Sequence, residues 1–346
     1  MRESWLPGRE RWRAAVRSAG RVCAGACLAL ASASAYGDGI VLVDESARQF
    51  NPSAGESATF AVEVPAGSES LEVRVHAADG APVRTLTRDT DAADRIEIEW
   101  DGRDDDGEIV PDEAYGLYLL ARGDDEVELA TLDLRESDEA AGGFAPGRMS
   151  GDLRIEATLE RAARVQVRIG IESGPLLRTL DDWRPRVAGR FTVPWDGFDQ
   201  SGAAYVADDR GLKTLVSTRE LPPGALLTFG NVSTVADSTP ASNLLLVSTD
   251  CAEDAAETLD VLVRRATPDV RIEGAYEVAF YVDHEFVSEE ERGYLPMRWR
   301  WDAGGTPRDR HLLTVNLLQF GGDILLGSAQ VDTTALCVAD DQEGRQ

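Results

Sequence analysis

The stretch WDGRDDDG, from Trp100 to Gly107, places four aspartates within eight residues and raises the question of calcium chemistry. A twelve-residue calcium loop carries oxygen ligands at its first, third and fifth positions, glycine at the sixth and glutamate at the twelfth. With Gly107 at the sixth position, acidic residues occupy the third, fifth and twelfth, but Gly102 at the first offers no side-chain ligand. The candidate calcium ligands are Asp101, Asp104, Asp106 and Glu113.

A tight turn is the alternative interpretation of this stretch, and the sequence favours it. Aspartate side chains bond to their own backbone in turns, and glycine supplies a positive φ. The stretch recurs as WDGFDQSG, from Trp195 to Gly202, where Gln200 and Ser201 replace acidic residues while the tryptophan and both glycines remain. The two stretches therefore share what a turn needs, and calcium remains a weak hypothesis for the first stretch alone.

Three further landmarks recur in the same order about 94 residues apart. They are FNP at 50–52 with FAP at 144–146, LEVRV at 71–75 with VQVRI at 165–169, and VRTL at 83–86 with LRTL at 177–180. Four landmarks in one order and at one spacing indicate a tandem duplication, so the chain contains at least two related structural units.

Hydrophobic side chains alternate with polar ones in both units, for example at Val73 and Val75 and at Val165 and Val167. This alternation predicts half-buried strands, and short strands separated by turns are typical of sandwiches. A diverged third unit shows the same pattern in YEVAFYVDHEFV at 276–287, whereas AEDAAETLDVLV at 252–263 suits either a strand or a short helix. We therefore predict an all-β fold of tandem immunoglobulin-like or fibronectin-type β-sandwiches.

The first two units resemble the FlgD-type immunoglobulin-like domain of bacterial surface and secreted proteins. The first unit matches the family pattern at Val73, Val75, Asp79, Gly80, Val83 to Leu86, Trp100 to Gly102, Asp104, Gly107, Val110 and Tyr115. The second unit departs from it with Arg210 and Lys213 in place of tyrosines, which leaves its last strand uncertain. The third unit resembles another bacterial immunoglobulin-like module, with His284 where glycine is usual. The resemblance implies the fold and a role as spacer, adhesive unit or appendage, but no particular ligand.

The N-terminal segment is predicted to be a signal peptide that is cleaved after Ala35. Six arginines precede or begin an uncharged stretch at 22–35, which ends in a small-x-small pattern and is too short to span a bilayer. A lipoprotein processed at Cys27 is the less favoured alternative. The predicted divisions are the signal peptide 1–35 and three domains at 36–140, 141–235 and 236–346, with an acidic Gly/Ala-rich linker at 136–147.

The chain is strongly acidic, with a formal net charge of −27. Such a charge argues against nucleic acids and anionic membrane surfaces as partners. No segment after the signal peptide is long and apolar enough to span a membrane, so we predict a protein of the periplasm, the cell surface or the extracellular space. After cleavage, Cys251 and Cys337 remain and are predicted to form a disulfide in the third domain, with two separate thiols as the alternative.

Three aromatic residues near turns of the second unit, Trp183, Phe198 and Tyr205, are candidate ligand-binding or interface residues. Trp183 lies in the polar stretch DDWRPR at 181–186, where a core position is hard to justify. An exposed tryptophan beside arginines is typical of a protein interface. A carbohydrate platform requires coplanar exposed rings. A position that caps the end of the sandwich is the third interpretation and the one that the sequence favours.

The sequence does not predict an enzyme. The histidines His76, His284 and His311 lie in separate segments without the spacing of metal ligands, and neither a G-x-S-x-G motif nor a phosphate loop occurs. We therefore predict a non-catalytic structural or adhesive protein of the cell envelope, or an extracellular protein, that binds protein partners. We predict no cofactor, with calcium at the first WDG stretch as a weak hypothesis. A carbohydrate-binding accessory protein is the alternative.

Overall fold

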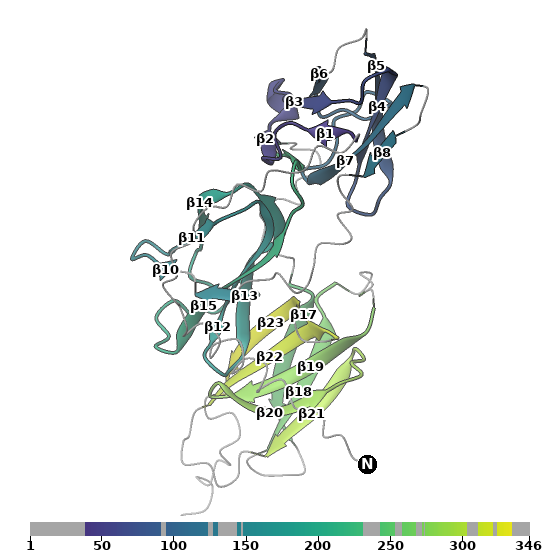
Figure 1. Cartoon of the computed structure of the whole chain (residues 1–346). Coiled ribbons are helices and arrows are strands. Elements are labelled where there is room, and N and C mark those ends of the chain that lie inside the picture. Colours follow the sequence, from purple (N-terminus) through teal and green to yellow (C-terminus); the bar gives the residue numbers. More distant parts are fainter. Residues whose placement is uncertain are drawn as a thin grey trace, which may run out of the picture.

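Figure 1 shows the computed structural model of the chain, in which three sandwiches follow one another along the molecule. The structure describes residues 39–90, 95–123, 127–130, 144–146, 148–230, 243–252, 258–267, 272, 274–302, 311–320 and 324–333. The predicted signal peptide, most of the predicted linker and Cys337 lie outside the described residues. The described elements are strands apart from one short 3₁₀ turn, Pro52–Ala54, which confirms the all-β fold.

The first unit packs a three-stranded sheet of order β1-β3-β6 against a larger sheet of order β2-β16-β7-β4-β5, in which β8 also pairs with β7. The bounds within 39–130 are β1 Val41–Leu42, β2 Arg48–Phe50, β3 Ala58–Glu63, β4 Ser68–His76, β5 Pro82–Asp89, β6 Arg95–Trp100, β7 Ala114–Gly123 and β8 Val127–Ala130. The alternating hydrophobic side chains of β3, β4 and β6 point into the core between these sheets, as the sequence predicted.

Three aromatic rings fill one end of this core. Trp100 meets Phe50 and Tyr115 edge-on, at ring-centroid distances of 5.6 and 5.2 Å. The Tyr115 hydroxyl donates a hydrogen bond to the Pro111 carbonyl at 2.8 Å, and burial raises the pKa of this phenol. The ring is therefore fixed at both ends, with its polar group satisfied at the margin of the core.

Strand β16, Leu226–Thr228, belongs to the sheet of the first unit although it follows the second unit in the chain. It pairs antiparallel with β7, with Leu226 opposite Tyr115, and parallel with β2. Leu226 is fully buried in the core of the first unit. This segment falls within the predicted second domain, 141–235, and its pairing with β2 and β7 corrects that prediction for β16.

The second unit repeats the plan of the first, with a sheet of order β10-β11-β14 packed on one of order β13-β12-β15-β9. The bounds are β9 Phe144–Pro146, β10 Arg148–Met149, β11 Arg154–Leu159, β12 Ala163–Ile171, β13 Leu176–Arg186, β14 Gly189–Pro194 and β15 Leu212–Glu220. The last strand, which the sequence left uncertain, is β15. It pairs with β12 along its whole length, so the missing tyrosines do not prevent a strand here.

The third unit packs a sheet of order β17-β18-β21 on one of order β20-β19-β22-β23. The bounds are β17 Leu245–Cys251, β18 Thr258–Arg265, β19 Tyr276–Val282, β20 Glu285–Glu290, β21 Met297–Asp302, β22 Leu312–Gln319 and β23 Leu325–Asp332. The segment left open between strand and helix is strand β18 from Thr258 onward. Asp283 and His284 form the turn between β19 and β20 with φ of 49° and 69°, so His284 adopts the positive φ that glycine usually supplies.

The second and third units contact each other through a small apolar interface. Leu176 at the start of β13 packs with Ala279, Leu318 and Leu325 of the third unit. The Ser328 hydroxyl donates to the Leu176 carbonyl at 3.4 Å. Beside this interface, His284 Nε2 lies 2.7 Å from an Asp209 carboxylate oxygen.

Within the described residues, no helix has the length and hydrophobicity that a membrane-spanning segment requires.

Candidate functional site

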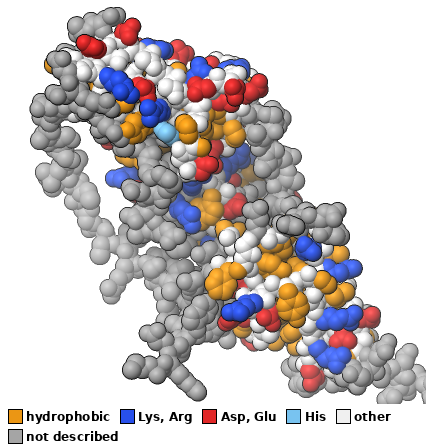
Figure 2. All heavy atoms as spheres, turned by 90° about the vertical axis from the view of Figure 1, so that its right-hand side faces the viewer, with side chains coloured by type: hydrophobic (Ala, Val, Ile, Leu, Met, Phe, Trp, Pro, Cys, Tyr) orange, Lys and Arg blue, Asp and Glu red, His pale blue; other side chains and the backbone are white. Residues whose placement is uncertain are grey.

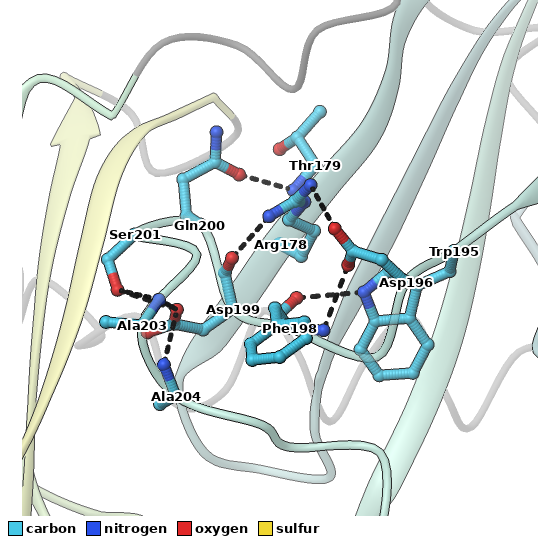
Figure 3. Close-up of polar contacts among 10 residues, drawn as sticks. All are labelled: Arg178, Thr179, Trp195, Asp196, Phe198, Asp199, Gln200, Ser201, Ala203 and Ala204. Atoms are coloured by element: carbon cyan, nitrogen blue, oxygen red, sulfur yellow. Dashed lines mark hydrogen bonds and ion pairs between the residues drawn. The ribbon is translucent and has the colours of Figure 1, made fainter.

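The two WDG turns have the same internal hydrogen bonds, as the duplication predicts. In the first turn, the Trp100 indole nitrogen donates to the Arg103 carbonyl at 2.9 Å. In the second, the Trp195 indole nitrogen donates to the Phe198 carbonyl at the same distance (Figure 3). Both tryptophan side chains are buried, so each ring anchors its turn to a core. The conserved geometry of these stretches is therefore structural.

The aspartate four residues after each tryptophan bonds to the backbone of its own turn. Asp104 Oδ1 accepts from the amides of Asp106 and Glu108 at 3.0 and 2.8 Å. Asp199 Oδ1 accepts from the Ser201 hydroxyl at 2.7 Å and from the amides of Ala203 and Ala204 at 3.3 Å (Figure 3). These carboxylates therefore serve the turn, as the favoured interpretation expects.

An arginine from the neighbouring strand also holds each turn. Arg84 of β5 donates to the Asp104 carbonyl at 2.7 Å, and Arg178 of β13 donates to the Asp199 carbonyl. These two arginines are the second residues of the repeated VRTL and LRTL motifs. The pairing explains why the motif and the WDG stretch occur together in both units.

The second turn is much more buried than the first. Asp199, Gln200 and Arg178 are 0%, 3% and 5% exposed, and the Gln200 side chain accepts from the Thr179 amide at 2.9 Å (Figure 3). Asp199 Oδ2 and Arg178 Nε are buried without a hydrogen-bond partner. Burial here stabilises a loop-to-strand contact and gives a ligand no access to the carboxylate.

The four candidate calcium ligands are not brought together. Glu113 Oε1 accepts from Arg164 Nη1 and from the Ala114 amide, both at 2.7 Å, and so points toward the second unit. The Asp101 side chain accepts from the Arg103 amide at 3.2 Å. Among the residues that the structure describes, no three His, Cys, Asp or Glu side chains form a group that could hold a metal ion. The geometry therefore gives the calcium hypothesis no support.

The three candidate aromatic residues do not form a common platform. Phe198 and Tyr205 meet edge-on, with centroids 5.4 Å apart and planes at 76°. Trp183 lies farther along β13, where two residues oppose one on β12, and its φ is 51°. The Arg219 guanidinium covers its ring, 4.0 Å from the centroid. The coplanar rings that the carbohydrate alternative requires are therefore absent from this set.

A cavity of about 300 Å³ lies between the first and second units, and the stretch that contains Trp183 forms one of its walls. The residues from the second unit are Arg184, Pro185, Arg186, Val187, Ala188, Arg190 and Phe191. The residues from the first unit's side are Gln49, Asp112, Thr228 and Phe229. Trp183, a candidate ligand-binding or interface residue, does not line this cavity, whereas Arg184 and Arg186 of the same stretch do.

The arginines of this wall differ in their partners. Arg186 contacts buried Asp181, with Nε and Nη2 at 3.1 and 2.5 Å from one carboxylate oxygen, and its guanidinium lies 4.7 Å from the Phe191 ring centroid. Arg184 and Arg190 are exposed and make no ion pair with any described residue. Two cationic groups thus face an opening in a protein whose net charge is −27.

The histidines are dispersed, as their sequence positions suggested. His311 Nδ1 lies 2.8 Å from Asp283 in the third unit, and its ring meets Trp301 edge-on at 5.1 Å. His284 contacts Asp209, and His76 contacts the Gly80 carbonyl at 3.2 Å. The His311 and His284 contacts join two segments of the fold, whereas the His76 contact is local to the turn after β4.

A family model described as the FlgD Ig-like domain matches residues 47–125. The matched segment includes β2 to β7 and ends well before β16. The match confirms the predicted resemblance for the first unit. No curated protein matches the chain.

Three solved structures show distant likeness. FlgD from P. aeruginosa is 21% identical, and the match covers 35% of this chain and 87% of that one, at a TM-score of 0.23. Dimeric latent PorU from Porphyromonas gingivalis is 8% identical over 86% of this chain and 34% of that one, at 0.19. Ruminococcus gnavus β-glucuronidase is 11% identical, and the match covers 52% of this chain and 34% of that one, at a TM-score of 0.19. The chain spans about a third of the latter two, and TM-scores this low establish no shared activity.

Proposed function

We propose that the protein is an exported, non-catalytic structural or adhesive component of the cell envelope or of an extracellular assembly, and that it binds protein partners through tandem immunoglobulin-like domains. The observation that carries the proposal is the pairing of β16 with β2 and β7, which joins the first unit to the end of the second. A chain in which a strand that follows the second sandwich completes the sheet of the first ties these two sandwiches together, which suits the spacing and presentation of binding surfaces.

We further propose that the second unit is a second FlgD-type domain and the third another bacterial immunoglobulin-like module. The equivalent hydrogen bonds of Trp100 and Trp195, and of Arg84 and Arg178, support this assignment for the second unit. The two-sheet plan and the positive-φ turn at Asp283 and His284 support it for the third.

The third unit offers the surface best suited to a protein partner. Figure 2 shows hydrophobic side chains gathered on the lower part of the face in view, which the third unit forms, and charged side chains interspersed over the first unit. The exposed large hydrophobic residues of the third unit are Leu246, Val287, Tyr294 and Phe320, and the last three are 43%, 57% and 52% exposed. Exposed aromatic side chains are typical anchors of protein interfaces.

Site-specific photocrosslinking in the producing cell tests the partner. A photoreactive residue at Tyr294 or Phe320 is expected to give a discrete protein adduct in the envelope or the medium, whereas the same residue at exposed Glu97 of the first unit gives none. Equal adducts at all three positions, or none at any of them, would contradict the proposal.

Processing of the purified protein tests the proposed export independently. We expect the N-terminus to be Tyr36 and a Cys251–Cys337 disulfide to appear in the non-reduced peptide map. An N-terminus at Met1 together with reduced Cys251 and Cys337 would contradict export, whatever the result of crosslinking.

A further inference from the structure

We propose that the cavity between the first and second units is a binding site for a small monocarboxylate with a compact apolar body. No part of the structural or adhesive role requires such a site. Its volume of about 300 Å³ is at the lower end of the range of small-molecule sites, roughly 300–1,000 Å³. The ligand class follows from the charges, the apolar lining and the fixed walls of the cavity.

The cationic wall supplies the recognition of a carboxylate. Arg184 lies near the end of β13 and Arg190 near the start of β14, and both exposed side chains line the same cavity. Neither forms an ion pair with a described residue. A guanidinium presents paired donors that match the two oxygens of a carboxylate. Among the residues that the structure describes, Arg184 and Arg190 are thus cations beside the cavity with no acidic partner, and they are available to an external anion.

The opposite wall limits the charge of the ligand. Asp112 lines the cavity from the first unit, and its carboxylate accepts a hydrogen bond from the Gly230 amide at 2.8 Å. A second negative group on the ligand would approach this aspartate and be repelled. The acid group is therefore expected at the arginine wall, with an uncharged body directed toward Gln49, Thr228 and Phe229.

The apolar part of the lining favours a body of low polarity. Phe229 is 38% exposed and lines the cavity together with Phe191, Pro185 and Val187. When a ligand removes such side chains from water, the burial lowers the free energy of the complex. An acid with an aromatic or branched body would place its charged end at the arginines and its apolar part against these side chains, which an inorganic anion cannot do.

Several groups that line the cavity are held in place before any ligand arrives. Phe229 follows β16, and its amide donates to the Phe50 carbonyl at 3.1 Å. The Thr228 hydroxyl donates to the Pro111 carbonyl at 2.8 Å. On the other side, Asp181 holds Arg186 across the Phe191 ring. Groups held in this way have little ordering entropy to lose on binding, so that cost falls mainly on the side chains of Arg184 and Arg190.

The test uses the mature chain, residues 36–346, with benzoate, neutral benzamide and phenyl phosphate as probes in calorimetry and amide NMR titrations. We expect benzoate to bind more tightly than either of the other probes, to bind more weakly at high salt, and to shift the amides of Phe229 and Arg190. Arg184→Gln and Arg190→Gln are each expected to weaken benzoate binding about tenfold, as for loss of a charged hydrogen bond.

Arg154→Gln is the matched control, because Arg154 is an exposed arginine of the same unit that pairs with Asp152 at 2.9 Å outside the cavity. Arg184 and Arg190 are exposed, so their substitution leaves the core intact. The proposal is overturned if no probe binds at millimolar concentration, if benzamide binds as well as benzoate, or if phenyl phosphate binds more tightly than benzoate. It is also overturned if Arg154→Gln weakens binding as much as the cavity variants.

Discussion

Leu226 lies opposite Tyr115 in the antiparallel pairing of β16 with β7, although the whole second sandwich separates these residues in the chain. On its other edge, β16 runs parallel to β2, so it separates two strands of the first unit. In the second unit, β9 pairs with β15 directly and no strand is inserted. The first unit therefore completes its sheet with a strand from beyond the second, and this strand ties the two units together.

Leu226→Ala is expected to destabilise the first unit by about 2–5 kcal/mol, because the side chain is fully buried in that core and its removal leaves a cavity. The measurement is the free energy of opening of the β4 amides, followed by hydrogen exchange during denaturant titration. Leu246→Ala, at a 46% exposed position of the third unit, is the control and should change stability by less than about 0.5 kcal/mol. Equal effects of both substitutions on β4 would contradict the assignment.

The Glu113–Arg164 ion pair is expected to couple the first two units. Its side chains are 32% and 15% exposed and 2.7 Å apart, so solvent screens the pair only in part. A double-mutant cycle with Glu113→Gln and Arg164→Met should give a coupling energy of about 1 kcal/mol. The exposed pair Arg161–Glu220, at 3.4 Å, is the matched control and should give a coupling near zero. Equal coupling in the two cycles would show that Glu113 and Arg164 contribute no more than surface charges.

Gly102→Ala is expected to destabilise the first unit more than Gly107→Ala. Both glycines have a positive φ, 72° and 84°, so either alanine strains the backbone by about 1–2 kcal/mol. A Cβ on Gly102 would lie 2.3 Å from Pro52 Cγ, whereas a Cβ on Gly107 would meet nothing within 4 Å. Thermal unfolding of the two variants should therefore differ by about 1–3 kcal/mol, the cost of overpacking. Identical melting temperatures would contradict this packing of the turn against Pro52.

Glu289→Gln is expected to raise the melting temperature at neutral pH. Burial, and then the neighbouring charge of Glu291, raise the pKa of the Glu289 carboxyl above its ordinary value of 4.5. The folded state therefore holds this proton more tightly than the unfolded state, and Glu289 costs stability as the pH rises above 4.5. Melting curves between about pH 3 and 8 should show the gain at high pH and none below about pH 4. Glu285→Gln, at an exposed position of the same strand, is the control, and an equal gain there would contradict the prediction.

The sequence predicted those parts of the fold that depend on local residue patterns. Alternation at Val73 and Val75 predicted a strand, and the Trp100 and Trp195 stretches predicted two equivalent turns, which share the same indole-to-carbonyl hydrogen bond. Those features depend on side chains within a few residues of each other. The strand and the two turns could therefore be predicted from the sequence alone.

The insertion of β16 and the cavity could not be predicted in this way. LLT at 226–228 is too short to show alternation, and its partners in β2 and β7 are set by the arrangement of whole units. Arg184 and Arg190 become neighbours of Phe229 only through that same arrangement. A tryptophan beside arginines in the polar stretch DDWRPR indicated a protein interface as one interpretation. Nothing local in that stretch indicates that Arg184 and Arg190 line one cavity with Phe229.

Native-state hydrogen exchange on the unmodified protein tests most directly whether β16 is an integral strand of the first unit. The amides of Leu226 to Thr228 and of Ala114 and Tyr115 should exchange with the same opening free energy as the core strand β4, because they open together with that sheet. Exchange of 226–228 at the rate of an exposed loop, while β4 stays protected, would contradict the account.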